Sequence, residues 1–369
     1  MAAAVSDTAW LSAMLRFESA LSVSEARLGI IPADAATSIA AACDVDRFDV
    51  AAIGAAAVSS AGPVVPLVDA LRRLVGESSA PYVHYGATSQ DTLDTAMMLV
   101  ARDALGLLTA DLSGLAARCA SLAQRHRSDV MTGRTLMQRA LPITFGFKSA
   151  NWLVGVLEAR TYLERIRRHR LAVQLGGAVG TLDAFGERGF ELVAVLASEL
   201  ELPVPDIPWH TVRTRIGELA AGLAIAAGAA TKIAIDIVLL AQSEVGEVLE
   251  ADPGRSSSMP HKQNPVHAIE SRAAFAGVIA QAGALLGSLP GEHERAAGSW
   301  QAEWPALSEA FRLTAGAVNR ATDAVSGLRV DTARMRENLP PDQRAAADFG
   351  VADAIIDRAL ALYSKEDSK

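Results

Sequence analysis

The stretch from Gly254 to Pro265 contains the residue types that a reactive loop needs. It reads Gly-Arg-Ser-Ser-Ser-Met-Pro-His-Lys-Gln-Asn-Pro, and its glycine, serines and prolines cannot continue a helix. A serine hydroxyl beside a cationic lysine and several backbone donors can be stabilised as its alkoxide and then act as a base. Ser256 and Lys262 are therefore candidates for chemistry. A hydrolase nucleophile is disfavoured because no Gly-x-Ser-x-Gly signature is present here.

A second polar segment precedes a long apolar stretch and reads Tyr-Val-His-Tyr-Gly-Ala-Thr-Ser-Gln-Asp over residues 82–91. Thr88 or Ser89 suits the N-cap of a helix, and such a helix start also offers N–H groups and hydroxyls to a carboxylate. Asp91 and Asp94 could suggest a metal, but no neighbouring histidine or cysteine completes a ligand set. We expect no metal and no cofactor.

A third polar segment, Gly-Arg-Thr-Leu-Met-Gln over residues 133–138, leads into Leu141-Pro142. Its arginine, threonine and glutamine stand ahead of what the pattern predicts to be a proline-started helix. They could form a capping arrangement or donate hydrogen bonds to an anionic ligand. The segment alone does not decide between these two interpretations.

The elements that must position these segments are helices. Apolar residues recur at three- and four-residue steps from Leu11 to Leu28, and longer helical stretches are predicted over 92–127, 145–175, 214–250 and 266–289. No alternating run predicts a strand of any length. Long antiparallel helices bury more than one face, so we expect a bundle shared among subunits. We predict an N-terminal helical domain over 1–90, a long-helix domain over 91–325 and a short helical tail over 326–369.

Composition excludes several classes of protein. Half of the residues are hydrophobic and the net charge is −8, which excludes a disordered chain and disfavours a nucleic-acid binder. Cys43 and Cys119 form no metal or disulfide pattern, and the N-terminus does not resemble a signal peptide, so we expect a cytoplasmic protein. Lys232 and Asp236 interrupt the most apolar stretch, over 219–241, so no membrane span is expected.

Taken together, the three segments in this order on a helical background resemble the fumarase/aspartase superfamily. Residues 256–265 match its signature loop, Ser-Ser-x-Met-Pro-x-Lys-x-Asn-Pro, and the resemblance extends from Phe17-Glu18 to about Trp304. It implies an all-α long-helix bundle that assembles as a homotetramer, with each active site built from three subunits. Members of the superfamily form or break a C–O or C–N bond β to a carboxylate.

Within the superfamily, the chain most resembles the bacterial 3-carboxy-cis,cis-muconate cycloisomerases. Four stretches carry this resemblance: 84–91, 174–182, 209–213 and 293–304. It implies intramolecular lactonisation of a tricarboxylate diene to 4-carboxymuconolactone in protocatechuate degradation by the β-ketoadipate pathway. The competing interpretations are an adenylosuccinate lyase, which eliminates fumarate, and an inactive structural tetramer such as a lens crystallin.

Three departures from the superfamily pattern bear on this choice. Leu136 stands where lyase and fumarase relatives have an acid/base histidine, and the cycloisomerases also lack that histidine. Arg255 replaces the glycine that usually precedes the signature serines. The chain also has a shorter C-terminal region than most relatives, so closure over the site is expected to differ.

The resemblance also implies a role for each candidate residue. Ser256 removes the proton next to a carboxylate in lactone opening and donates it in lactone formation, while Lys262 and Asn264 neutralise the carboxylate that gains charge. Arg295 gives electrostatic assistance near the reacting centre. The remaining candidates bind the substrate carboxylates: His84, Thr88, Ser89, Arg134, Gln138, His210 and Arg213.

Overall fold

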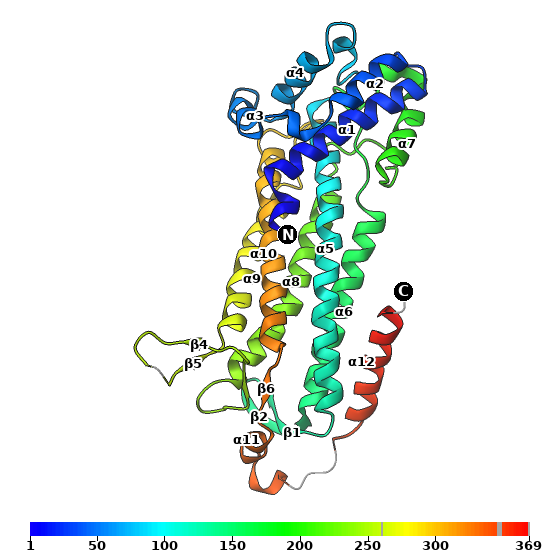
Figure 1. Cartoon of the computed structure of the whole chain (residues 1–369). Coiled ribbons are helices and arrows are strands. Elements are labelled where there is room, and N and C mark those ends of the chain that lie inside the picture. Colours follow the sequence, from blue (N-terminus) through cyan, green and yellow to red (C-terminus); the bar gives the residue numbers. More distant parts are fainter. Residues whose placement is uncertain (260, 345–348, 368–369) are drawn as a thin grey trace. The chain divides into compact units, whose positions relative to one another are not determined.

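The computed structural model describes residues 1–259, 261–344 and 349–367 and is predominantly helical (Figure 1). The predicted all-α class with a bundle of long helices is confirmed. Two compact units share the chain: residues 1–107, 164–221 and 281–312 form the first, and residues 108–163, 222–280 and 313–369 form the second. This division runs across the long helices, so the expected three-part division along the sequence stays a prediction.

The first unit contains a group of shorter helices. Ser6 caps the first of them by accepting the N–H of Ala9 at 3.2 Å, and Phe17 and Leu21 bury its apolar face. This helix packs against the second and the seventh helices of the chain. The bounds are α1 Asp7–Arg27, α2 Ala33–Ala42, α3 Val50–Ala57, α4 Val64–Val75 and α7 Gly189–Leu200. Short 3₁₀ turns cover Ala2–Val5, Val45–Arg47, Val58–Ser60, Ala80–Tyr82, Asp183–Arg188 and, in the second unit, Pro341–Gln343.

Five long helices contribute residues to both units: α5 Ser89–Arg125, α6 Phe145–His169, α8 Thr214–Leu240, α9 Val266–Gly287 and α10 Ser299–Val325. The first four confirm the helices predicted from apolar spacing. The sequence did not predict α10, because Pro305 interrupts the pattern and removes a helical hydrogen bond. Burial of Leu307 and Phe311 on the following turns offsets that loss.

The second unit contains short β-ladders that the sequence analysis missed. Strand β1 Val130–Thr135 pairs with β2 Gln138–Thr144, so the expected proline-started helix is wrong. Leu136 and Met137 form the two-residue turn with φ of +48° and +66°, as a type I′ hairpin requires. The other elements are β3 Val248–Leu249 with β6 Arg329–Val330, β4 Gly254–Arg255 with β5 Gln263–Asn264, α11 Thr332–Glu337 and α12 Ala352–Asp367.

Helix α8 is the most apolar element of the chain. Of the described residues it forms the one helix long and apolar enough to cross a membrane, and half of its most apolar window is buried in the protein. Core helices of globular proteins have the same length and composition. In the second unit it packs through Ala227 against Val278 of α9 and Ala317 of α10.

Candidate active site

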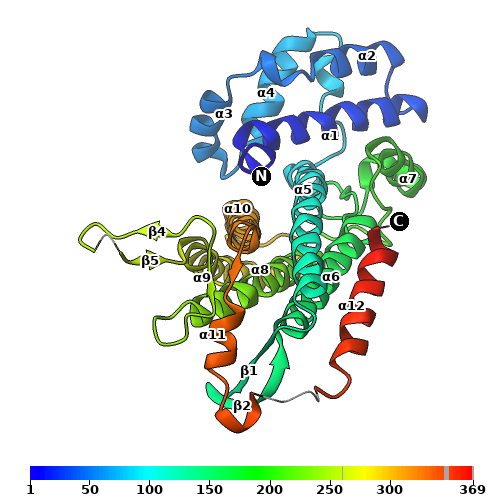
Figure 2. The same cartoon turned by 60° about the horizontal axis from the view of Figure 1, so that its bottom comes forward.

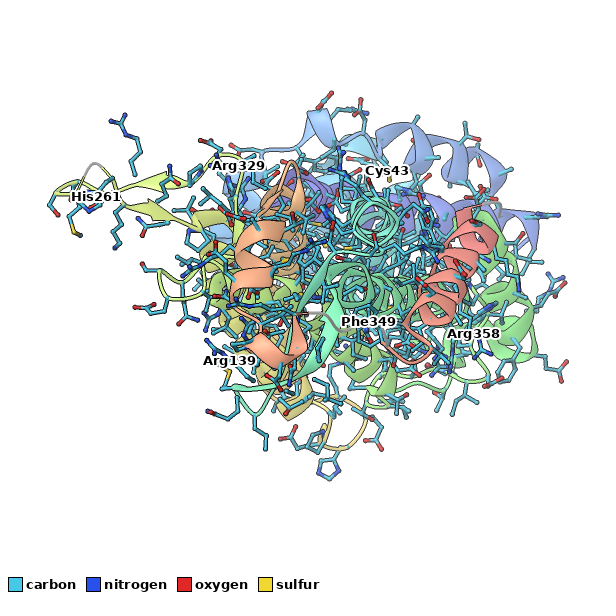
Figure 3. All side chains as sticks on the ribbon, turned by 90° about the horizontal axis from the view of Figure 1, so that it is seen from below. Cys43, Arg139, His261, Arg329, Phe349 and Arg358 are labelled. Atoms are coloured by element: carbon cyan, nitrogen blue, oxygen red, sulfur yellow. The ribbon has the colours of Figure 1, made fainter. Side chains whose placement is uncertain are left out.

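The predicted reactive loop is the turn of the β4–β5 hairpin. In the second unit this hairpin extends away from α9, and His261 lies near its outer end (Figures 1, 2 and 3). The Ser256 Oγ accepts the backbone N–H of Met259 at 3.1 Å and of Ser258 at 3.4 Å. Hydrogen bonds to an oxygen that gains negative charge favour its ionised form. Pro260 of the signature lies outside the described residues.

Both ends of this loop are fixed to the helix that follows it. Buried Glu250 accepts the N–H groups of His267 at 3.2 Å and Ala268 at 2.9 Å, which are free donors at the start of α9. Asn264 donates from Nδ2 to the Gly254 carbonyl at 3.4 Å across the hairpin. A Cβ on Gly254 would overlap the Val266 side chain. The ends of the loop are thus fixed while its Lys262 is exposed to solvent.

The start of α5 is organised by Asp91, whose carboxylate is fully buried. It accepts the backbone N–H groups of Gly176 and Gly177 at 2.9 Å each, and that of Thr88 at 3.0 Å. Its Oδ1 also lies 2.7 Å from Nε2 of His210. Asp91 therefore joins the helix start, the glycine-rich segment and the His210 loop of the first unit.

His84 lies at the same helix start, and its ring is held by a second carboxylate. Its Nδ1 lies 2.8 Å from Oε1 of Glu18 on α1. Burial lowers the pKa of His84, but the charge of Glu18 and its hydrogen bond together raise this pKa above its usual value. The half-buried Thr88 and Ser89 follow in the chain, so the His84 ring and the N-terminus of α5 are both available to an anion.

Arg213, which is predicted to bind the substrate, is buried among protein groups. It is 3% exposed, and its Nη1 and Nη2 donate to Asp94 at 2.6 and 3.0 Å. Nε donates to Glu303 at 3.0 Å, Nη2 also pairs with Glu303, and Nη1 reaches the His210 carbonyl at 3.5 Å. All five N–H donors of the guanidinium are therefore used inside the protein. These contacts fix the His210 loop to α5 and α10.

Arg295 belongs to the same group of the first unit but remains exposed. Its Nε donates to Oε1 of Gln90 at 3.3 Å, and its Nη2 donates to the Ala178 carbonyl at 3.1 Å. Gln90 in turn donates to the His210 carbonyl at 2.7 Å. These contacts place the Arg295 side chain beside the N-terminus of α5.

The two candidates on the β1–β2 hairpin differ in their surroundings. Arg134 forms a two-pronged ion pair with buried Glu247, at 2.6 and 3.0 Å, and Asn338 donates to the same carboxylate at 2.8 Å. This pairing neutralises Arg134, so its geometry favours holding the hairpin over binding a substrate anion. Gln138 begins β2 with an exposed side chain.

The candidates thus form two groups, one on each unit. The first unit holds six of them: His84, Thr88, Ser89, His210, Arg213 and Arg295. The second unit holds the other five: Arg134, Gln138, Ser256, Lys262 and Asn264. Among the residues that the structure describes, no three or more His, Cys, Asp and Glu side chains gather as a metal site would require.

Sequence reasoning missed two of the carboxylates that position these side chains. Glu18 lies on the buried face of α1, and Asp91 was considered only as a helix-start or metal-binding residue. The available signal for Glu18 was an acidic residue next to Phe17 within the apolar spacing of the first predicted helix. A buried carboxylate needs a partner, but the sequence does not indicate which of the histidines supplies it.

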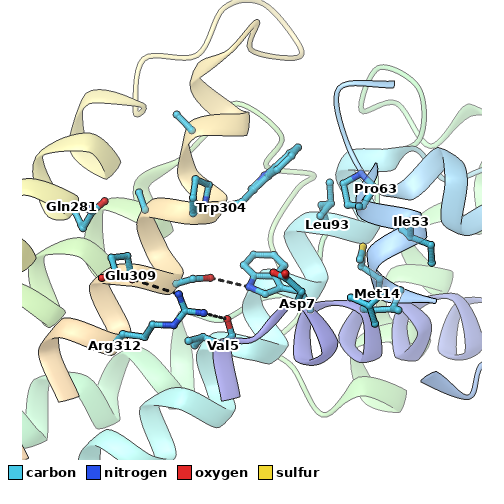
Figure 4. Close-up of a pocket in the computed structure, with 18 of the residues that line it drawn as sticks. Val5, Asp7, Met14, Ile53, Pro63, Leu93, Gln281, Trp304, Glu309 and Arg312 are labelled. Atoms are coloured by element: carbon cyan, nitrogen blue, oxygen red, sulfur yellow. Dashed lines mark hydrogen bonds and ion pairs between the residues drawn. The ribbon is translucent and has the colours of Figure 1, made fainter. Parts of the chain in front are cut away.

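A cavity of about 730 Å³ lies elsewhere in the first unit (Figure 4). Its walls are mainly apolar and include Trp10, Met14, Ile53 and Trp304. Trp10 donates to Ser308 at 2.9 Å, whereas the buried N–H of Trp304 has no hydrogen-bond partner among the described residues. None of the predicted site residues is among those that line it, so this cavity takes no part in the chemistry considered below.

Comparison with known proteins identifies relatives of this chain both by sequence and by structure. A model of the family described as "Lyase" matches residues 2–279. The chain is 46% identical to 3-carboxy-cis,cis-muconate cycloisomerase of Bradyrhizobium diazoefficiens, over 97% of this chain and 81% of that protein. It is 45% identical to nitrosuccinate lyase of Streptomyces davaonensis, over 91% and 74% respectively. The crystal structure of 3-carboxy-cis,cis-muconate lactonizing enzyme from Pseudomonas putida superposes with a TM-score of 0.89 at 35% identity, covering 98% of this chain and 96% of that one.

Proposed function

Because this chain belongs to the lyase family of the fumarase/aspartase superfamily, we propose that it is a 3-carboxy-cis,cis-muconate cycloisomerase. The enzyme closes 3-carboxy-cis,cis-muconate to 4-carboxymuconolactone within the β-ketoadipate pathway of protocatechuate degradation. The observation that carries the proposal is the 46% identity to a cycloisomerase over 97% of the chain. Leu136 supports it, since the acid/base histidine of the lyases is replaced by a residue that cannot transfer a proton.

The reaction needs one proton transfer and one anion that must be stabilised. In lactone formation, a substrate carboxylate attacks the diene within the same molecule, so proximity supplies much of the acceleration. Negative charge then develops on the carboxylate next to the carbon that receives the proton. Ser256 donates that proton, and its alkoxide is stabilised by the N–H groups of Ser258 and Met259. Lys262 and Asn264 balance the charge on the carboxylate.

The other substrate carboxylates are assigned to the group in the first unit. His84, with Thr88 and Ser89 at the start of α5, binds one of them, and the adjacent Arg295 assists the reacting centre. His210 completes the pocket, oriented by the Asp91 carboxylate. We assign Arg213 and Arg134 to positioning, because their guanidinium groups are paired with buried carboxylates.

The active enzyme is proposed to be a cytoplasmic homotetramer whose sites are shared between subunits. Large apolar side chains support the assembly, because they are exposed on α8 and α9 of the second unit: Ile225 47%, Ile235 38%, Ile269 47% and Ile279 48%. Exposed apolar surface of this kind marks interfaces between chains. The signature-loop group and the α5 group belong to different units of the chain.

A spectrophotometric assay with purified protein tests the function. Addition of 3-carboxy-cis,cis-muconate is expected to give loss of the diene absorbance, with the lactone identified by NMR. Adenylosuccinate and nitrosuccinate serve as elimination substrates, the second because a 45% identical relative is a nitrosuccinate lyase. Turnover of either substrate without lactonisation would show that the protein is a lyase and not a cycloisomerase. No turnover of any of the three by a tetrameric protein would support the structural interpretation.

A further inference from the structure

We propose that Glu18 is a positioning residue that holds His84 as the cation which binds one substrate carboxylate. This inference rests on the proposed function and deepens it, because it assigns a charge state and an orientation to one subsite. The structure makes the assignment through contacts that lie entirely within the first unit. Glu18 acts through His84 and does not itself touch the substrate.

The contact geometry leaves only one ring nitrogen of His84 for a ligand. The Glu18 side chain is fully buried, and its Oε1 lies 2.8 Å from Nδ1 and accepts the Thr92 hydroxyl at 3.0 Å. Thr92 follows the start of α5, so α1 and α5 both hold the carboxylate. With Nδ1 used, Nε2 is the nitrogen that can meet an anion, and the His84 side chain remains 13% exposed.

The backbone around His84 is also fixed. His84 has a φ of +61°, a left-handed conformation that residues other than glycine rarely adopt. Gly86 has a φ of +63°, and a Cβ there would overlap the Phe185 ring. This turn fixes the position from which the His84 side chain leaves the backbone, and the Glu18 contact to Nδ1 then sets the direction of Nε2.

The charges that face His84 come from three helices. Burial opposes protonation most strongly, and Arg72 on α4 adds to this effect. Glu18 on α1 and Asp91 on α5 favour protonation and outweigh both, so the pKa of His84 lies above its ordinary value. Loss of the Glu18 charge should therefore lower this pKa and release the proton at a lower pH.

Glu25, two turns further along α1, provides a matched control. It is fully buried, and among the described residues neither of its carboxyl oxygens has a hydrogen-bond partner. Burial, with the charge of Glu18, raises the pKa of Glu25 to about 9, so this side chain is neutral at pH 7. A Glu→Gln change thus removes a charge at position 18 but none at position 25.

The experiment compares Glu18→Gln with Glu25→Gln. The glutamine oxygen at position 18 can still accept the Nδ1–H, so this variant keeps the hydrogen bond and removes only the charge. His84 is titrated by ¹⁵N NMR in the tetrameric protein, and its ring signals are identified as those that are absent from His84→Gln. KM and kcat for 3-carboxy-cis,cis-muconate are measured across pH 5.5–9. Tricarboxylate binding without turnover is followed with 1,2,3-propanetricarboxylate.

In Glu18→Gln we expect the pKa of His84 to fall by about one to three units. The alkaline limb of kcat/KM should move down by the same amount, with KM raised and kcat nearly unchanged, because a ground-state carboxylate contact is lost. Glu25→Gln should leave the His84 titration and the kcat/KM profile unchanged. Glu18→Asp should keep part of the rise in the pKa of His84. In a protein that already carries His84→Gln, Glu18→Gln should cause no further change in kcat/KM.

An unchanged pKa of His84 in Glu18→Gln would overturn the inference. A lowered pKa that moves neither the kcat/KM profile nor the affinity for 1,2,3-propanetricarboxylate would overturn it as well. If Glu18→Gln does not fold, the NMR titration of Glu18→Asp decides, since a carboxylate withdrawn by one methylene should give a smaller rise in pKa. Wild-type protein that titrates as expected and binds the tricarboxylate, yet does not lactonise the muconate, would refute the proposed function alone.

Discussion

At the scale of single residues, the buried charges of the first unit separate structural from chemical roles. Arg213 resembles a substrate-binding residue in sequence, but its five donors are used by Asp94, Glu303 and a backbone carbonyl. The sequence predicted a binding role for the segment 209–213 and could not distinguish its members, because burial and pairing are set by residues about 90 and 120 positions away. Arg295, with an exposed side chain, keeps the capacity to act on a ligand.

Removal of Arg213 should therefore lower stability sharply. Arg213→Ala leaves the carboxylates of Asp94 and Glu303 buried without their cation, which costs about 3–5 kcal/mol in the free energy of unfolding. Urea denaturation measures this value. Arg295→Ala is the control and should change it by less than about 0.5 kcal/mol. A stable Arg213→Ala protein that has lost only substrate affinity would restore the binding role predicted from the sequence.

Glu25 should give the protein a pH dependence of stability. Its folded pKa of about 9 exceeds the ordinary 4.5, so between these values the folded state binds more protons than the unfolded state. Its contribution is fully present below about pH 4.5 and is lost as the pH rises towards 9. Glu25→Gln should raise the free energy of unfolding at pH 8 by on the order of a few kcal/mol. Denaturation at pH 4.5 and pH 8 checks this, and an equal effect at both would contradict it.

At the scale of elements, the signature loop depends on how its hairpin meets α9. A Cβ on Gly254 would overlap the Val266 side chain, so Gly254→Ala must displace strand β4, which leads into the signature loop. We expect kcat/KM to fall by about 10²-fold, because a displacement of about 1 Å of catalytic groups can cost this much, while the thermal midpoint changes little. Gly283→Ala in α9 meets open space and should have neither effect. Full activity of Gly254→Ala would show that the loop position is not critical.

The helices could be predicted from sequence better than the strands could. Apolar spacing identified α5, α6, α8 and α9 because each runs for six turns or more. The β1–β2 hairpin was missed since its strands are short and its turn residues, Leu136 and Met137, are not the usual Asn-Gly type. The Glu18–His84 contact was missed for another reason: it joins residues 66 positions apart, which no local pattern indicates.

At the scale of the whole molecule, the exposed apolar faces of α8 and α9 predict the assembly. Wild-type protein should have the mass of four 38.6 kDa chains in light scattering. Ile225→Glu combined with Ile279→Glu places charges on these faces and should dissociate the tetramer. The control is Val58→Glu, at an 87% exposed position of the first unit. Activity lost together with the tetramer would support shared sites, whereas a fully active monomer would refute them.

The central claim is that the Ser256 hydroxyl transfers the proton, and lactonisation by Ser256→Ala tests it most directly. The rate of loss of 3-carboxy-cis,cis-muconate absorbance is compared for wild-type and variant tetramers of equal thermal midpoint. We predict a fall in kcat of about 10²- to 10⁴-fold, the usual contribution of a positioned acid or base. A Ser256→Ala tetramer that lactonises at nearly the wild-type rate would contradict the account.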